Sequence, residues 1–349
     1  MRRALALAAR GLGQTAPNPM VGAVVVRGGR IVGEGFHARF GSAHAEIGAL
    51  EDSGAKAHGA TVYVTLEPCA HWGKTPPCVD ALIAAGVRRV VCATRDPGKR
   101  SGGGARKLRR AGIEVEFGLE EAAARELNAP FFHAQSGADR PWVTLKMALS
   151  ADGAVAVTRG RRTAITGVRA DREVHRLRAQ SDAIAVGIGT ARADDPELTV
   201  RLGRPPRVPP VRVVFDRDAR LPLRSRLAQS SPLIPTVVLA ARKVPKRELA
   251  LFRKGVDVMY ARTLARALQL LARHDVRSLL VEGGPTLAAA FLAARLVDRI
   301  VIFRSPRRLG AGAIAAFDDA SFLDRFRVVA RRRLGTDVMT IYDPRARMP

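Results

Sequence analysis

Short apolar runs alternate with segments of helical spacing along the first third of the chain. Gly22–Arg27 and Arg30–Phe36 are joined at Gly28-Gly29, and a double glycine between two apolar runs is a strong hairpin signal. The predicted order, β-β-α-β-α-β-α-β, indicates a mixed sheet with helices on its faces. The other predicted elements are strands 61–66, 87–93 and 113–117, and helices 44–50, 79–85 and 105–111.

A small, polar segment that ends in proline, residues 135–141, predicts a domain boundary. We therefore expect two α/β domains, residues 1–137 and 142–349. The Pro- and Arg-rich stretch 201–210 is predicted to be a surface loop. The elements predicted for the second domain are strands 142–149, 182–187, 212–215, 235–239, 256–260, 278–282 and 299–302, and helices 170–178, 263–274 and 286–294.

The apolar runs are too short for a membrane protein, because a membrane-spanning helix needs roughly 18 apolar residues. The first ten residues are similar to a short signal peptide, but Arg10 interrupts their apolar stretch, which favours an amphipathic helix. The chain has three cysteines, and Cys92 lies in an apolar run typical of a buried residue. Without a disulfide framework, we expect a reducing, cytoplasmic location.

The formal net charge of +26 is unusual, and only eight of the 58 basic residues are lysine. A strongly basic chain can bind nucleic acid. However, the arginines are scattered from end to end, and aromatic residues, which stack on single-stranded bases, make up only 5% of the chain. We therefore interpret the charge as a preference for Arg over Lys, with some arginines binding anionic substrates, and do not expect nucleic-acid binding.

Potential metal ligands occur as His44-x-Glu46, followed by Cys69 and, after eight intervening residues, Cys78. One imidazole and two thiolates suit zinc with its fourth position open for water. Zinc lowers the pKa of such a water, and Glu46 can move its protons. H-x-E…P-C-x-x-C is typical of zinc deaminases that act on bases. We do not count His71 among the zinc ligands, because a fourth protein ligand would make the site structural. The alternative to a zinc site is that His44 is an ordinary helix histidine and that Cys69 and Cys78 are core thiols.

Longer motifs surround these residues. The N-terminal half contains T-A-P-N-P-M-V-G-A-V (15–24), H-A-E (44–46) and E-P-C-A-H-W-G-K-T-P-P-C (67–78). The C-terminal half contains K-M-A-L-S-A-D-G (146–153), I-T-G (165–167), H-R-L-R (175–178), G-I-G-T (187–190), A-D-D-P-E-L-T-V-R (193–201) and V-E-G-G-P-T (281–286). On these motifs the first half resembles the deaminase of riboflavin biosynthesis, and the second half resembles the reductase usually fused to it.

The resemblance implies an α/β fold: a cytidine-deaminase-like α/β/α sandwich followed by a dihydrofolate-reductase-like α/β domain. It implies zinc-dependent hydrolytic deamination of 2,5-diamino-6-ribosylamino-4(3H)-pyrimidinone 5′-phosphate. NADPH-dependent reduction of the ribosyl chain of 5-amino-6-(5-phosphoribosylamino)uracil to ribityl would follow. The implied cofactors are one Zn²⁺ per chain and NADPH, and the expected assembly is a homo-oligomer formed through the reductase domain.

In the deaminase half, the resemblance and the local sequence indicate four substrate-binding residues. Asn18, between two prolines, is expected to bind the pyrimidine edge, with a plain Asx turn as the alternative. Lys74 and Thr75 lie between the cysteines and are expected near the ring or phosphate, although a solvated loop lysine is also possible. Asp96 follows a predicted strand and is expected to hold ribose hydroxyls. The glycine-rich stretch Ser101–Gly104 precedes a helix and is either a phosphate site or a flexible turn.

In the reductase half, the strand–turn–helix pattern of 281–286 offers free N–H groups that suit cofactor phosphates. Two arginines suit a ribose phosphate, although each alone is commonly a solvated surface charge. Glu282 is expected to orient the substrate. The implied cofactor residues are Ala148, Thr190, Asp194, Gly283, Gly284, Pro285 and Thr286, and the implied substrate residues are Arg178, Leu198, Arg201 and Glu282.

The chain departs from the family pattern at Arg162 and Ala164, where Ser and Trp are common. That Trp normally packs by the nicotinamide, so a deaminase whose reductase half only binds is one alternative. A nucleic-acid-acting zinc deaminase and an inactive zinc-stabilised scaffold are the others. Family members generally carry a few residues before the position of Met1, so either the first helix is short or the true start lies upstream.

Overall fold

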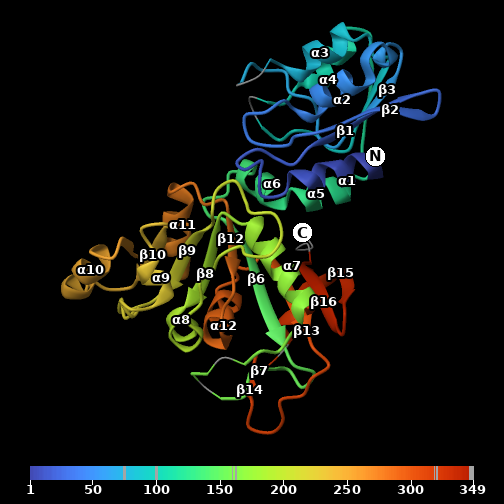
Figure 1. Cartoon of the computed structure of the whole chain (residues 1–349). Coiled ribbons are helices and arrows are strands. Elements are labelled where there is room, and N and C mark those ends of the chain that lie inside the picture. The colour runs from blue at the N-terminus through green and yellow to red at the C-terminus, as the bar shows by residue number, and fades with distance from the viewer. Residues whose placement is uncertain are drawn as a thin grey trace. The chain divides into compact units, whose positions relative to one another are not determined.

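The computed structural model describes residues 1–73, 76–98, 101–158, 160–161, 163–317, 319 and 321–345. The chain forms two compact units, Met1–Ala138 and Asp139–Pro349 (Figure 1). Each unit is a mixed α/β structure with its own hydrophobic core. None of the helices in the described ranges combines the length and the apolar character needed to cross a membrane.

The first unit is built on a five-stranded sheet with the order β2-β1-β3-β4-β5. Its strands are β1 (Gly22–Arg27), β2 (Arg30–Phe36), β3 (Thr61–Val64), β4 (Arg89–Cys92) and β5 (Glu114–Phe117). Its helices are α1 (Arg2–Ala8), α2 (Ala45–Ser53), α3 (Cys78–Ala84), α4 (Gly104–Arg110), α5 (Glu121–Leu127) and α6 (Ala129–Gln135), with short 3-10 turns at Ala9–Gly11 and Gly54–Ala57. β1 is antiparallel to β2 and β3, whereas β3, β4 and β5 are parallel, so the sheet is mixed.

Helices cover both faces of this sheet. α2, α3 and α4 bury one face against alternate strand residues such as Val62 and Val90. On the other face, Ala4 and Leu7 of α1 pack on Val24 of β1. The parallel strands β3 and β4 therefore end at a common edge, where the chain turns into α3 and toward α4. Polar residues that follow these strands are brought together at that edge.

Helix α2 lies so close to β2 that two strand positions must be glycine. A Cβ atom on Gly35 would lie 2.2 Å from the carbonyl oxygen of Ala45 and 2.4 Å from the backbone nitrogen of Ala49. A Cβ atom on Gly33 would meet the carbonyl oxygen of Ala49 at 2.4 Å. The missing side chains let the strand and the start of the helix touch backbone to backbone. This contact sets the position of α2.

The second unit is built on a nine-stranded sheet with the order β11-β10-β9-β8-β12-β6-β13-β16-β15, beside a two-stranded sheet of β7 and β14. Its strands are β6 (Trp142–Leu149), β7 (Ala154–Ala156), β8 (Ala183–Gly187), β9 (Val211–Phe215), β10 (Thr236–Ala240), β11 (Val256–Tyr260), β12 (Ser278–Val281), β13 (Arg299–Arg304), β14 (Ile314–Ala315), β15 (Phe326–Leu334) and β16 (Asp337–Pro344). Its helices are α7 (Val168–Ala179), α8 (Ile188–Asp194), α9 (Arg226–Gln229), α10 (Pro245–Phe252), α11 (Leu264–Arg273) and α12 (Pro285–Ala293), with a 3-10 turn at Ser321–Arg325.

Helices also cover both faces of the large sheet (Figure 1). Leu268 of α11 and Phe291 of α12 belong to the core on one face. On the other face, Val174 of α7 packs on β13 and β16, and Leu251 of α10 belongs to a separate cluster over β8, β9 and β10. Neighbouring strands in the sheet order β11-β10-β9-β8-β12-β6-β13 are all parallel, so their carboxyl ends form one edge. The turns after β8 and β12 are neighbours there.

The structure confirms the predicted strands and helices within a few residues, with one small correction and several additions. The helix predicted from His44 begins at Ala45, and His44 is its N-cap. The sequence pattern did not reveal the short helices α5, α6, α8, α9 and α10, or the C-terminal hairpin of β15 and β16. β15 is an edge strand whose residues are largely exposed, with a register shift near Val328, so it lacks a clear two-residue alternation.

Gly35→Ala should destabilise the first unit and displace the start of α2. The new Cβ would meet backbone atoms that cannot rotate away, and such overpacking costs about 1–3 kcal/mol in the free energy of unfolding. Calorimetry of the full chain, with bound zinc measured alongside, checks this. The matched control is Gly48→Ala, where the Cβ has an ordinary 3.6 Å contact with Gly35 and alanine favours the helix. Equal stability of the two variants would contradict the role of this contact.

Candidate metal centre and cofactor-binding turns

Three potential metal ligands meet at the edge of the first sheet. His44 precedes α2, Cys69 follows β3, and Cys78 begins α3. Their donor atoms all lie within 4.8 Å of one another. The His44 Nδ1 atom is 3.2 Å from the Cys78 Sγ atom and 3.6 Å from the Cys69 Sγ atom. Tetrahedral zinc ligands of this kind are about 3.5 Å apart, so both the donor types and their spacing fit one zinc ion.

The charges of the cluster also suit a cation. Hydrogen bonds from Cys78 and then from His44 lower the pKa of the Cys69 thiol to about 4, so Cys69 is a thiolate at neutral pH. The hydrogen bond with this thiolate raises the pKa of Cys78, which therefore keeps its proton. Binding of a metal ion to such a pair releases the remaining proton, because zinc is bound by thiolates.

Glu46 lies in the first turn of α2 and is only 3% exposed. Burial, and to a smaller extent the charge on Cys69, raise the pKa of Glu46 to about 7. A carboxyl group with this pKa can both accept and donate a proton near neutral pH. Glu46 is not one of the three clustered donors, so it can act on a ligand beside the metal.

The structure places Asn18 beside a histidine that the sequence analysis did not single out. The Nδ2 atom of Asn18 lies 3.3 Å from the Nε2 atom of His37, whose Nδ1 atom lies 3.1 Å from the carbonyl oxygen of Ala43. Since a carbonyl only accepts, His37 Nδ1 carries the proton and Nε2 accepts from Asn18. This assignment leaves the Asn18 Oδ1 atom as an acceptor. The His37 ring also packs edge-on against His44, with centroids 5.4 Å apart.

Asn128, in the turn between α5 and α6, fixes the segment that carries Asn18. Its side chain is buried, accepts from the Met20 N–H at 2.8 Å and donates to the Met20 carbonyl at 2.9 Å. These two bonds satisfy both backbone groups of one residue, as a neighbouring strand would. No local motif marks Asn128 for this role, because its partner lies 108 positions earlier in the chain.

Glu67, two residues before Cys69, joins the loops at this edge. Its buried carboxylate accepts from the N–H of Ala105 in α4 at 2.9 Å and from the N–H of Asp96 at 3.3 Å. Asp96 in turn accepts from the Gly98 N–H at 2.8 Å, and burial raises the pKa of Asp96. Glu67 therefore couples the loop of a metal ligand to that of a predicted substrate residue.

In the glycine-rich stretch Ser101–Gly104, Gly104 has a packing role that the sequence analysis did not anticipate. A Cβ atom on Gly104 would lie 1.9 Å from the carbonyl oxygen of Pro68, so only glycine lets α4 approach the turn before Cys69. The next N–H, that of Ala105, is already bound to Glu67. Close packing, which neither a phosphate site nor a flexible turn requires, therefore accounts for Gly104.

In the second unit, two glycine turns lie side by side after the parallel strands β8 and β12. A Cβ atom on Gly284 would lie 3.0 Å from the Thr190 Oγ1 atom, which brings the start of α12 against α8. Cβ atoms on Gly187 and Gly283 would both contact Leu287, at 3.6 and 3.3 Å. Helix starts at the carboxyl ends of adjacent parallel strands suit phosphate groups. These turns fit the phosphates of a dinucleotide cofactor.

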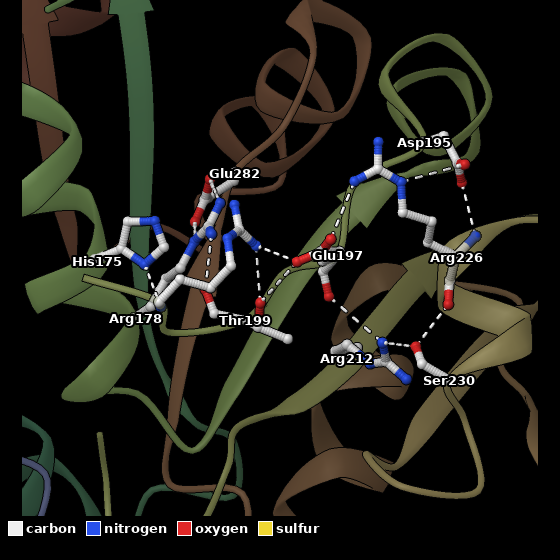
Figure 2. A network of polar contacts seen from close by, with 10 residues as sticks. His175, Arg178, Asp195, Glu197, Thr199, Arg212, Arg226, Ser230 and Glu282 are labelled. Atoms are coloured by element: carbon white, nitrogen blue, oxygen red, sulfur yellow. Dashed lines mark hydrogen bonds and ion pairs between the residues drawn. The ribbon is translucent and has the colours of Figure 1, made fainter. Parts of the chain in front are cut away.

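Two of the predicted substrate residues of this unit, Arg178 and Glu282, belong to a polar network (Figure 2). The Arg178 Nε and Nη2 atoms donate to the two carboxylate oxygens of Glu282, at 2.6 and 2.9 Å, and Nη1 donates to the Thr199 carbonyl at 3.0 Å. Lys146 Nζ lies 3.9 Å from the same carboxylate. Although burial opposes it, Arg178 and Lys146 hold the pKa of Glu282 below its usual range. Arg178 is thus paired with Glu282, and its expected contact with the substrate phosphate stays a prediction.

Comparison with known proteins identifies both halves. Residues 1–94 match the model of the cytidine and deoxycytidylate deaminase zinc-binding region, and residues 141–340 match that of the RibD C-terminal domain. The riboflavin biosynthesis protein RibD of Aquifex aeolicus is 44% identical over 89% of this chain and 87% of its own length. The RibD of Escherichia coli is 39% identical over 97% and 96%. The chain belongs to the RibD family.

Solved RibD structures have the same fold. Acinetobacter baumannii RibD, form 1, superimposes with a TM-score of 0.85 at 39% identity, covering 99% of this chain and 97% of that one. The Thermotoga maritima deaminase/reductase has the same TM-score at 37% identity. These matches confirm the predicted fold class, a cytidine-deaminase-like domain before a reductase domain. A RibD-family chain is a bifunctional deaminase and reductase of riboflavin biosynthesis, so the predicted enzyme class is confirmed.

Three residues named from the RibD resemblance lie outside the described part of the chain: Lys74, Thr75 and Arg162. Among the described ones, Leu198 is buried and has a positive φ of 51°. Arg201 is half exposed and pairs with Glu197 at 2.7 Å. Ala148 lies in β6, Asp194 ends α8, and Pro285 and Thr286 begin α12. His71, which lies between Cys69 and Cys78 in the sequence, is not in the three-donor cluster.

Replacing Glu67 by Gln should weaken the metal centre of this RibD-family chain. The amide would turn an NH₂ group toward one of two N–H donors, which costs about 1–3 kcal/mol in the stability of the site. Bound zinc and the deaminase kcat/KM should both fall, and the reductase rate of the same chain should not. Glu114→Gln, at an exposed position of β5, is the matched control and should leave both unchanged. Normal zinc content and deaminase rate in the Glu67 variant would refute the coupling.

Proposed function

We propose that this chain catalyses two successive steps on one pyrimidine ribosyl 5′-phosphate. The first is hydrolytic deamination of 2,5-diamino-6-ribosylamino-4(3H)-pyrimidinone 5′-phosphate by residues 1–137. The second is reduction of the ribosyl chain of 5-amino-6-(5-phosphoribosylamino)uracil to ribityl by residues 142–349. The observation that carries the proposal is the three-donor cluster of His44, Cys69 and Cys78 with the buried Glu46 beside it.

In the deaminase half, His44, Cys69 and Cys78 would hold one Zn²⁺. When bound, zinc supplies Lewis-acid activation of water at neutral pH. Glu46 takes a proton from the attacking water and returns it to the departing amino group, which leaves as ammonia. Its raised pKa, about 7, suits both transfers.

The substrate ring is bound by groups that the fold orients in advance. Because His37 accepts the Asn18 amide N–H, the Asn18 Oδ1 atom can accept from a ring N–H or an exocyclic amino group. Asp96 is proposed to bind ribose hydroxyls, and Lys74 and Thr75 to contact the ring or the phosphate. This proposal rests on the sequence, in which Lys74 and Thr75 stand between Cys69 and Cys78.

In the reductase half, NADPH would lie on the two glycine turns, and when bound it supplies the hydride. Its contacts are proposed to come from Ala148, Thr190, Asp194, Gly283, Gly284, Pro285 and Thr286. The anionic Glu282, held by Arg178 and Lys146, is proposed to accept from hydroxyl groups of the substrate. Arg178, Leu198 and Arg201 are proposed to complete the substrate site, with the two arginines toward the phosphate.

We propose a cytoplasmic location and a homo-oligomer formed through the reductase half. The partners are the pyrimidine substrate and NADPH, without nucleic acid. A deaminase whose reductase half only binds is the competing function, and it rests on Arg162 and Ala164, where the family commonly has Ser and Trp.

Glu46→Gln should abolish ammonia release while zinc and fold are retained. Loss of a general acid–base group lowers the rate by about 10²–10⁴-fold. The assay reads ammonia release from the diaminopyrimidinone substrate, and metal analysis reads the zinc. Glu51→Gln, on the exposed part of the same helix α2, should behave as wild type. Wild-type deamination in the Glu46 variant would refute its role.

The Glu46 variant also tests the second half. Supplied with the deaminated uracil, it should oxidise NADPH at the wild-type rate, because Glu46 is in the other compact unit. Absence of NADPH oxidation in both wild type and variant, with zinc and deamination intact in wild type, would favour the deaminase-only alternative.

A further inference from the structure

The segment from Asp195 to Arg201, called here the substrate segment, adopts a conformation that needs external support. Asp195 and Leu198 have φ angles of 39° and 51°, in the left-handed region that side chains other than glycine rarely adopt. Only partners elsewhere in the unit can offset that local cost. The segment is contacted from two sides (Figure 2).

On one side, residues of β9 and α9 hold the first half of the segment. The Arg226 Nη1 atom lies 3.1 Å from a Glu197 carboxylate oxygen, and the Arg226 N–H donates to the Asp195 carboxylate at 2.9 Å. The buried Arg212 donates to the Glu197 carbonyl at 3.4 Å and to Ser230 at 2.6 Å. These partners leave the other half, Leu198 to Arg201, to be held from α7.

On the α7 side, two side chains one turn apart hold the backbone of the segment. Arg178 donates to the Thr199 carbonyl at 3.0 Å. The Nδ1 atom of His175 accepts from the Arg201 backbone N–H at 2.9 Å. Because a backbone N–H only donates, Nδ1 must carry no proton, and His175 is the neutral tautomer protonated at Nε2. An imidazolium would present an N–H to this N–H.

The surroundings of His175 keep it neutral at pH 7. The ring is buried, and burial, followed by the charges of Arg178 and Arg201, lowers its pKa. Glu282 at the end of β12 and Asp171 on α7 act in the opposite direction, but Glu282 is already bound by Arg178 and is near Lys146. A depressed pKa means that the bond is fully formed above about pH 6.5 and is lost as pH falls through the folded value.

We propose that His175 is a positioning residue of the reductase: its neutral imidazole fixes the backbone at Arg201, and its protonation releases the substrate segment. The link to turnover rests on the proposed function, in which Leu198 and Arg201 bind substrate. Release of the segment therefore affects substrate KM, whereas the glycine turns proposed for NADPH precede α8 and α12 and lie outside the segment.

Two substitutions of His175 distinguish its role as a hydrogen-bond acceptor from the effect of its protonation. His175→Asn places an amide oxygen near the position of Nδ1 and cannot titrate, whereas the longer side chain of His175→Gln places its oxygen near the position of Nε2. His274→Asn, at the exposed end of α11, is the control. Substrate KM and kcat for NADPH oxidation are measured with the deaminated uracil from pH 8 downward, through the folded pKa of His175.

As pH falls from 7.5 through the folded pKa of His175, wild type and the His274 variant should show a KM increase that exceeds that of His175→Asn by about five- to tenfold, the value of one hydrogen bond. Titration of the substrate phosphate is common to all variants and cancels in this comparison. His175→Gln should have a KM raised by about the same factor at every pH, with an unchanged KM for NADPH. Identical pH profiles of wild type and His175→Asn, or an unchanged KM in His175→Gln, would overturn the proposal.

Amide hydrogen exchange at Arg201 tests the same bond without turnover. Corrected for its intrinsic pH dependence, exchange should accelerate about five- to tenfold in wild type as pH falls from 7.5 through the folded pKa of His175, and it should stay constant in His175→Asn. If wild type fails to reduce the uracil, the proposed function is wrong, and this exchange still decides whether His175 holds the segment. The amides of Glu197, Leu198 and Thr199 report whether the segment is released as a unit. Equal exchange in both proteins would overturn the proposal.

Discussion

The convergence of one imidazole nitrogen and two thiol sulfurs within 4.8 Å is the constraint on which the first unit depends. Three separate elements must end at one point for it to exist: the start of α2, the loop after β3 and the start of α3. Backbone contacts at Gly35 and Gly104 allow two helices to approach closely enough. Without a bound cation, Cys69 and Cys78 share one proton in a hydrogen bond. A bound Zn²⁺ would replace that proton, because zinc is bound by thiolates.

In both units, a buried side chain accepts hydrogen bonds from backbone N–H groups near the proposed site. These N–H groups belong to segments that lie outside the strands of the sheets. In the first unit, the Glu67 carboxylate accepts the N–H groups of Asp96 and Ala105, which lie on the connection from β4 into α4. In the second, His175 accepts one from the substrate segment. Buried acceptors of this kind make loop geometry reproducible, and reproducible geometry is what proton and hydride transfer require.

The sequence alone could predict those parts of the site whose signal is local. The hairpin followed from Gly28-Gly29, and the metal ligands followed from the spacing of His44, Cys69 and Cys78. The parts it could not predict depend on partners that are distant in the chain. Gly104 serves a contact with Pro68, and Arg178 binds Glu282, 104 positions away. Asn128 similarly lacked any local pattern that pointed to Met20.

Removal and return of zinc tests the central claim most directly, because it separates the two activities in one chain. The metal is removed by a chelator, and ammonia release from the diaminopyrimidinone substrate is measured beside NADPH oxidation with the deaminated uracil. We predict that ammonia release is lost, that one equivalent of Zn²⁺ per chain restores it, and that NADPH oxidation stays constant. Ammonia release that persists at full rate in the zinc-free protein would contradict the account.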